Sequence, residues 1–183
     1  MSGVTGDFAA LEELAEKFRK LTTSEARIAL SKNLAEEYTD FMVECFRESR
    51  SPYGQAWEPL RFRSSSGGRG QKPLLNSGLM RGATSPVDIR EDGFTVQVGR
   101  DYASTHQQGA TIVPRNAKAL RFAGVVYEAR GRGRARRKGT GFIFRKKVVV
   151  PARPFAPING MPDELQERLD EAGSEFLRDY FGE

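Results

Sequence analysis

Apolar residues recur at helical spacing through the first quarter of the chain. Residues 8–21 carry one at every third or fourth position, which predicts an amphipathic helix. A longer stripe of the same spacing, which includes Cys45 as a small apolar residue, predicts a second helix over residues 25–48. The proline and glycine of "SPYG" then end the pattern, so the helical N-terminal part is expected at residues 7–48.

Alternating apolar and polar positions take over in the middle of the chain and predict strands. Residues 85–90 and 94–99 alternate in this way and flank "EDG", a pattern typical of a β-hairpin. Residues 110–113 form another candidate strand. Residues 118–127 and 140–150 are longer β segments, and their simplest arrangement is a long hairpin.

Glycine-rich polar segments interrupt this β-rich core, which spans residues 51–158. The composition of "SSSGGRGQKP" predicts a flexible loop at residues 64–72. The stretch "EARGRGRARRKG" predicts a second flexible loop at residues 129–140, at the turn of the long hairpin. Residues 74–83 are compatible with either a short helix or an irregular turn.

A third helix is predicted at the C-terminal end, over residues 161–181. Pro162 suits a first helical position, and Leu165, Leu169, Phe176 and Tyr180 form an apolar face. The order of helices, strands and helix indicates an α+β fold, an antiparallel sheet packed with two N-terminal helices and one C-terminal helix. Without an internal repeat or a dividing linker, residues 1–183 are expected to form a single domain.

The composition agrees with a folded globular chain. Hydrophobic residues make up 38% and charged residues 29% of the 183 positions. No apolar run approaches the roughly 20 residues of a membrane span, and the N-terminus lacks the pattern of a secretory signal. Because Cys45 is the only cysteine, an internal disulfide is impossible, and synthesis in a reducing cytoplasm is expected.

Charge is distributed unevenly along the chain. The formal net charge is +5, yet residues 111–158 alone carry +12, while residues 1–50 carry −3 and residues 159–183 carry −6. A basic centre between acidic ends favours either a localised anion-binding face or complementary contacts between subunits.

The basic centre is the strongest candidate contact surface. A segment of this kind neutralises phosphates without reading base sequence, and it equally suits an acidic protein partner or plain solvation. The candidate residues for contact with DNA or a protein partner are Arg130, Arg132, Arg134, Arg136, Arg137, Lys138, Arg145, Lys146 and Lys147.

His106, the only histidine, raises the question of catalysis. A histidine base needs a nucleophile and usually a carboxylate that orients it. Ser104 and Thr105 adjoin it in sequence, Asp101 lies nearby, and no motif places any of the three against the imidazole. A structural histidine is therefore the favoured interpretation, with no catalytic residue expected.

Metal and cofactor sites are not expected either. One histidine and one cysteine do not make a typical transition-metal site, and the chain has neither a phosphate-binding loop nor a dinucleotide motif. The acidic residues after Pro162 complement the dipole at a helix start.

Four sequence blocks follow one another in fixed order: "SPYGQAWEPL", "KPLLNSGLMRG", "VQVGRDYASTHQQGATI" and "VVVPARPFAPI". Together they resemble the phage virion morphogenesis family, which includes Mu-like protein G and P2-like tail completion proteins. The matching positions, called the signature residues below, are Pro52, Gly54, Trp57, Gly78, Tyr102, Ala103, His106, Gln107, Gly109, Pro151, Arg153, Pro154 and Phe155.

The resemblance implies structural work rather than catalysis. Proteins of this type are similar to tail-terminator and head–tail joining proteins, so it implies a ring, expected to be hexameric, at the tail end or neck of a virion. The implied partners are tail tube or sheath proteins and head connector or neck proteins, with possible non-specific contact to genomic DNA in a channel, and no membrane. The competing hypothesis is a nucleic-acid-binding protein that uses the basic hairpin at residues 130–147.

Ring assembly requires that one patch of a subunit meet a different patch of the next. The C-terminal acidic helix and the basic strands supply opposite charges for such a contact. The candidate subunit contacts on that helix are Asp163, Glu164 and Glu167.

Overall fold

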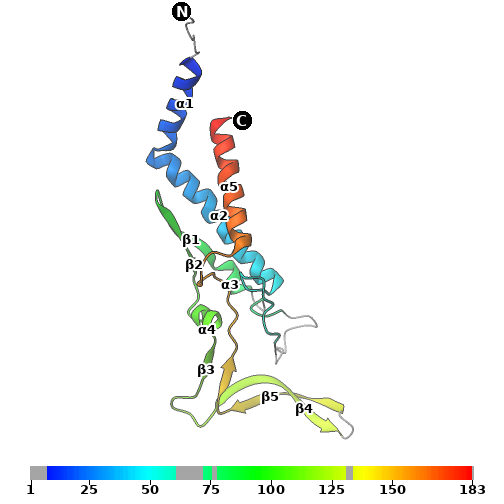
Figure 1. The fold of residues 1–183 in the computed structure, drawn as a ribbon. Helices are drawn as coiled ribbons and strands as arrows, with labels where there is room; N and C mark the ends of the chain where they lie inside the picture. Colours follow the sequence, from blue (N-terminus) through cyan, green and yellow to red (C-terminus); the bar gives the residue numbers. More distant parts are fainter. Residues whose placement is uncertain (1–7, 61–71, 76–77, 131–133, 183) are drawn as a thin grey trace, which may run out of the picture. The chain divides into compact units, whose positions relative to one another are not determined.

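The computed structural model describes residues 8–60, 72–75, 78–130 and 134–182, except for the side chains of residues 8–11 and 123–140. The described elements confirm the α+β class (Figure 1). In chain order they are α1 (Phe8–Leu21), α2 (Ser24–Glu48), α3 (Leu79–Gly82), β1 (Thr84–Arg90), β2 (Gly93–Val98), α4 (Ala103–Gln108), β3 (Ala110–Ile112), β4 (Leu120–Arg130), β5 (Arg134–Arg145), β6 (Val148–Val150) and α5 (Asp163–Phe181).

Two compact units make up the chain, and each is built from separate segments. The first unit contains residues 1–44, 84–98 and 158–183, and the second contains residues 45–83 and 99–157. Neither unit is a continuous stretch, because the chain passes from one to the other at four places. The expectation of a single domain over the whole chain stays a prediction.

In the first unit, three helices accompany the β1–β2 hairpin. The predicted hairpin is present, with Ile89 opposite Phe94 and Arg90 opposite Gly93. Its alternation buries one face more than the other, and the ring of Phe94 packs edge-on against Tyr38 of α2 at 5.7 Å. The core of this unit consists of Ala26, Ala35, Phe41, Met42 and Leu165, all buried.

The C-terminal end of α5 is fastened to α1. The ring of Phe181 lies 5.4 Å from that of Phe18, and Lys17 donates a hydrogen bond from Nζ to the Phe181 carbonyl at 2.9 Å. Gly182, in the left-handed conformation, closes the last turn by donating its N–H to the Arg178 carbonyl. At the other end Pro162 is the N-cap of α5 rather than its first helical residue, so the helix begins at Asp163, two residues later than predicted.

A cluster of opposite charges joins α5 to α2. Arg168 of α5 binds Glu44 through Nη2 and lies 3.6 Å from Glu37, both on α2, and 3.5 Å from Glu164 on its own helix. Its guanidinium also lies over the ring of Phe41, 5.5 Å from the centroid. Burial by itself lowers the pKa of Arg168, but the hydrogen bond to Glu44 and the three negative charges outweigh burial and raise that pKa.

The second unit is organised around aromatic side chains. The ring of Phe46, in the last turn of α2, stacks on Phe155 at 5.2 Å and meets the edge of Trp57 at 5.8 Å. All three residues are buried, as is Met80 of α3. Trp57 therefore holds the turn after α2 against the core.

The strands form three separate antiparallel pairs, β1–β2, β3–β6 and β4–β5, rather than the single sheet expected from the sequence. The predicted strand at 140–150 is split. Lys146 and Lys147 lie outside the strands, so β5 pairs with β4 while Val148–Val150 pairs with β3. Two consecutive exposed lysines satisfy neither the pattern of a half-buried strand nor that of a buried one.

The flexible loop predicted at residues 64–72 lies outside the described residues, except for Lys72. The prediction of a flexible loop at 129–140 is wrong for residues 129–130, which end β4, and for residues 134–140, which belong to β5. The ladder continues to the pair Arg130↔Arg134, with one irregularity between Val126 and Tyr127. Main-chain hydrogen bonding is independent of side-chain type, so the basic residues do not prevent pairing, and a bulge accommodates the glycine-containing stretch.

The Arg168 cluster predicts the first mutational result. Replacing Arg168 with Met leaves the carboxylates of Glu37, Glu44 and Glu164 close together without their shared cation, which costs about 2 kcal/mol of unfolding free energy. The matched control is Arg178→Met on the same helix, where the side chain is exposed and no ion pair is described. Urea unfolding followed by circular dichroism measures both; equal effects of the two substitutions would contradict the prediction.

Candidate functional site

Three of the four signature blocks meet in the second unit, at the segment of residues 151–157. This segment, "PARPFAP", has proline at every third position, and proline has no N–H to donate to a β-ladder. Several of its backbone groups bond instead to Trp57, His106 and Gln107 of the other blocks, while the side chain of Arg153 donates to the Glu58 carbonyl. The side chains of Trp57, Gln107 and Arg153 are called the clamp below.

Gln107 binds the segment as a neighbouring strand would. Its side-chain oxygen accepts hydrogen bonds from the N–H groups of Phe155 at 2.9 Å and Ala156 at 3.1 Å. Its amide nitrogen donates to the Ala156 carbonyl at 2.8 Å. Because Gln107 is buried, these groups have little access to water, and the side chain satisfies three backbone groups at once.

Arg153 ties the same segment to two further places. Its Nε and Nη2 both donate to the Glu58 carbonyl, at 3.1 and 3.0 Å, and its backbone N–H donates to the His106 carbonyl at 2.7 Å. Burial lowers the pKa of Arg153, and the charge of Glu58 opposes that shift. Guanidinium stays protonated regardless, so the unit contains a nearly buried cation held by a backbone carbonyl.

Trp57 completes the clamp. Its indole N–H donates to the Pro154 carbonyl at 2.8 Å, and its backbone N–H donates to the Ser49 carbonyl at 2.8 Å. The indole thus contributes apolar surface to the core and satisfies one carbonyl of the proline-rich segment.

Gly109 allows the approach of β3 to β6. Its φ of +76° lies in the left-handed region, and a Cβ there would stand 2.8 Å from the nitrogen of Ala152 and 3.1 Å from the Val150 carbonyl oxygen. Both are backbone atoms that cannot move aside, so glycine is required on two grounds.

The other signature residues shape turns and helix ends. Pro52, which is buried, and Gly54, which has a φ of +79°, lie in the turn that pairs Ser51 with Gln55. Gly78, at φ +66°, is the N-cap of α3, and Tyr102 and Ala103 begin α4. Pro151 and Pro154 lie within the proline-rich segment described above.

His106 lies half-buried beside Tyr102 and Arg153. Its ring meets the edge of Tyr102 at 5.9 Å, and its buried Nδ1 has no hydrogen-bond partner in the described part of the chain. Burial, and secondarily the positive charge of Arg153, lowers the pKa of His106. The surroundings therefore favour the neutral imidazole, and no carboxylate orients it there.

Basic candidate residues follow the β4–β5 ribbon. Arg130 ends β4, Arg134, Arg136, Arg137 and Lys138 lie in β5, and Arg132 falls outside the described residues. Arg145 ends β5, and Lys146 and Lys147 are exposed between β5 and β6. Between residues 120 and 145 the chain has eight basic residues and one acidic residue, Glu128.

Sequence reasoning missed the aromatic residues at the base of this ribbon. Phe122, Phe142 and Phe144 are exposed, and the guanidinium of Arg121 lies 4.1 Å from the centroid of the Phe142 ring. The pattern "GFIFR" indicates a strand but not whether either face is covered.

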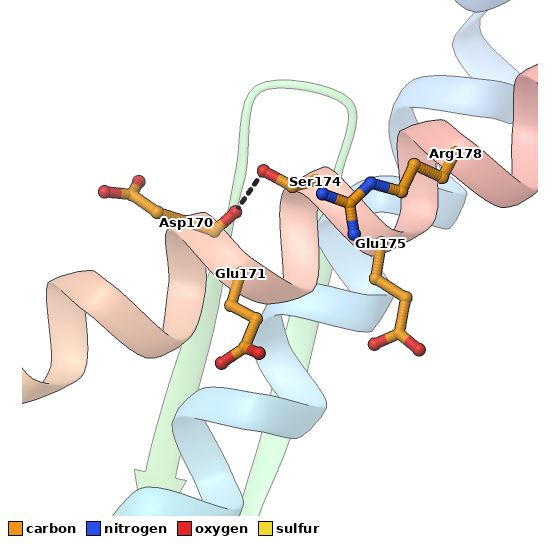
Figure 2. Close-up of a pocket in the computed structure, with 5 residues that line it drawn as sticks. All are labelled: Asp170, Glu171, Ser174, Glu175 and Arg178. Carbon is orange, nitrogen blue, oxygen red and sulfur yellow. Dashed lines mark hydrogen bonds between the residues drawn. The ribbon is translucent and has the colours of Figure 1, made fainter. Parts of the chain in front are cut away.

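The acidic candidates on α5 separate into two kinds. Glu164 is engaged with Arg168, whereas Asp163 and Glu167 are exposed and have no ion pair in the described part of the chain. Further along, an open groove of about 430 Å³ is lined by five residues of the same helix (Figure 2). They are Asp170, Glu171, Ser174, Glu175 and Arg178. One helix alone lines this groove, so it lacks the converging walls of a small-molecule pocket.

Within the described residues, no group of three or more histidine, cysteine, aspartate or glutamate side chains has the arrangement of a metal site. None of the described helices is long and apolar enough to span a membrane.

A family model described as the phage virion morphogenesis family matches residues 7–174. No curated protein and no solved structure matches the chain. The matched range includes the whole clamp and most of α5.

The clamp predicts a specific loss of stability. Gln107→Leu keeps the approximate volume but leaves two N–H groups and one carbonyl of the proline-rich segment without their partner, so the free energy of unfolding should fall by about 3 kcal/mol. The matched control is Gln108→Leu, at the adjacent exposed position, with an expected change within about 0.5 kcal/mol. Urea titration of both proteins is the measurement, and a loss below about 1 kcal/mol for Gln107→Leu would contradict the clamp.

His106 predicts a pH dependence. Because its pKa is lower in the folded than in the unfolded chain, the unfolded chain binds the proton more readily. Stability should therefore be complete above about pH 6.5, the ordinary histidine value, and decrease as the pH falls toward the folded pKa. Unfolding free energies at pH 7.5 and 5.5 test this: His106→Gln should lose less stability than wild type over that interval, and parallel losses would refute it.

Proposed function

The chain belongs to the phage virion morphogenesis family, and from this premise we propose that it is a non-catalytic structural protein of a tailed bacteriophage that completes the tail or joins head and tail. The observation that carries the proposal is the extent of the family match, over residues 7–174. In the proposal the protein forms a ring at the tail end or neck and is part of the finished virion. Its partners there are tail tube or sheath proteins and the connector or neck proteins of the head.

The internal construction supports a structural role. The clamp side chains form their hydrogen bonds with backbone atoms of the same chain. These bonds fix the geometry of the unit and leave no reactive group exposed by the clamp. A component that joins two large assemblies needs a rigid scaffold from which contact surfaces project, because flexible surfaces lose entropy when they are ordered.

The basic ribbon supports a second candidate function, that of a nucleic-acid-binding protein acting through residues 130–147. The observation in its favour is the ladder that continues to Arg130↔Arg134 and holds basic residues on two paired strands. Contacts of this kind neutralise phosphates and weaken steeply as salt rises.

Electron microscopy of particles produced without this protein tests the proposal. The expected result is DNA-filled heads and separate, unjoined tails, restored to joined particles by the wild-type chain supplied in trans. Tails of uncontrolled length would assign it to tail termination, and absent or contracted tails beside normal heads would assign it to an earlier step of tail assembly.

Two results would count against the first candidate. Normally joined particles in the absence of the chain would exclude a role in completion or joining. Salt-dependent binding of duplex DNA by the isolated monomer, together with normal particles, would favour the second candidate instead.

A further inference from the structure

The base of the β4–β5 ribbon exposes aromatic rings on both faces. Phe142 and Phe144 alternate along β5 and are 54% and 58% exposed; Phe122 of β4 pairs with Ile143 on the opposite face and is 43% exposed. A two-stranded ribbon is marginally stable alone, and large apolar side chains left on both faces indicate surface that another body covers.

From this arrangement we infer that the ribbon base, defined as Arg121, Phe142, Phe144 and the adjoining residues 145–147, is an interface with a second copy of this chain, whose α5 receives it. The inference rests on the proposed function, since it names the contact by which the ring would form.

The charges at the ribbon base determine which surface of the second copy fits. Arg121, Arg145, Lys146 and Lys147 flank the phenylalanines, and all of them are exposed. Two ribbon bases facing each other would bring these like charges within a Debye length of about 8 Å. A symmetric ribbon-to-ribbon contact is therefore disfavoured, and an acidic surface is required.

α5 supplies that acidic surface. Between Asp163 and Phe181 it has seven acidic and two basic residues, and one of the basic residues, Arg168, is occupied by Glu37, Glu44 and Glu164. Figure 2 shows Glu171 and Glu175 one turn apart and pointing to the same side of the helix, in a groove that Asp170 and Arg178 also line. In the described part of the chain, Glu171 and Glu175 have no ion pair, and both are exposed. Of the acidic residues selected from sequence, Glu164 is already engaged with Arg168, whereas Glu167 is exposed one turn before Glu171 and extends the same acidic surface.

The area of a stable interface also requires both the phenylalanines and the charged residues of the ribbon base. The two half-exposed phenylalanines on one face, Phe142 and Phe144, offer on the order of 200 Å², since a fully buried aromatic side chain covers about 150–250 Å². A standard interface buries about 800 Å² on each partner. The remaining area fits the charged rim, whose lysine and arginine stems cover apolar surface while their charges meet carboxylates.

One chain thus bears two different, complementary surfaces. A contact between unlike patches is heterologous, so each copy retains a ribbon for one neighbour and an α5 for the other. Such a contact closes into a ring when the rotation between neighbours permits it, and otherwise extends as a filament.

Charge-swapped variants of the full chain test this contact. One variant carries Lys146→Glu with Lys147→Glu, and the other carries Glu171→Arg with Glu175→Arg. Each alone brings like charges together, so self-association measured by sedimentation equilibrium should weaken at least tenfold. An equal mixture of the two should assemble like wild type, because every neighbouring pair then has opposite charges. A third variant, Phe142→Ser with Phe144→Ser, should also weaken assembly, and mixing it with either charge-swapped variant should not restore assembly.

Matched controls lie on α1. Glu12→Arg with Glu16→Arg repeats the spacing and charge change of the α5 variant, and Arg19→Glu with Lys20→Glu repeats that of the ribbon variant, all at exposed positions. Both controls should assemble like wild type, and circular dichroism establishes that every variant is folded.

Three results would overturn the inference: a wild-type chain that stays monomeric at its highest soluble concentration, an α5 variant that assembles normally, or a mixture that fails to assemble. If the swapped variants behave like wild type while particles still need the chain for joining, the contact is wrong and the proposed function stands. If the swaps behave as expected while particles without the chain are normal, the contact stands and the function is wrong.

Discussion

A backbone that cannot form its own sheet hydrogen bonds is the central constraint of the second unit. Prolines at 151, 154 and 157 remove every third donor, so the segment leading toward α5 cannot act as an inner strand. The remaining backbone groups still need partners when buried, and Gln107 and Trp57 provide them from other blocks. The aromatic stack of Phe46, Trp57 and Phe155 forms around these bonds, so polar and apolar contributions depend on each other.

Local sequence patterns predicted most of the helices and strands correctly. The helical spacing of residues 8–21 and 25–48 predicted α1 and α2 within one residue, and "EDG" predicted the β1–β2 hairpin. Hydrophobic period depends on neighbours a few positions away, which the sequence displays directly. The pairing of 118–127 with 140–150 was likewise predicted, although the latter segment serves two sheets.

Long-range partners were harder to predict. The sequence identified Gln107 as a signature residue but did not indicate that its side chain bonds to Phe155 and Ala156. A glutamine both donates and accepts hydrogen bonds, and its position in the sequence does not specify which distant groups it will bond. The strand at Arg134–Arg145 was underestimated, since glycine and arginine are weak β formers and cross-strand pairing overrides propensity. The exposure of Phe142 depends on what covers the ribbon, which alternation alone does not encode.

The position of Trp57 has a practical consequence. It is the only tryptophan of the chain, and its indole is buried against Phe46 with its N–H on the Pro154 carbonyl. Indole emission depends on the polarity around the ring. Tryptophan fluorescence therefore reports on one place, where the proline-rich segment packs against the end of α2. The first unit has no tryptophan, and its opening is spectroscopically silent in that channel. The protein thus contains a native optical probe that distinguishes loosening of one unit from loosening of the other.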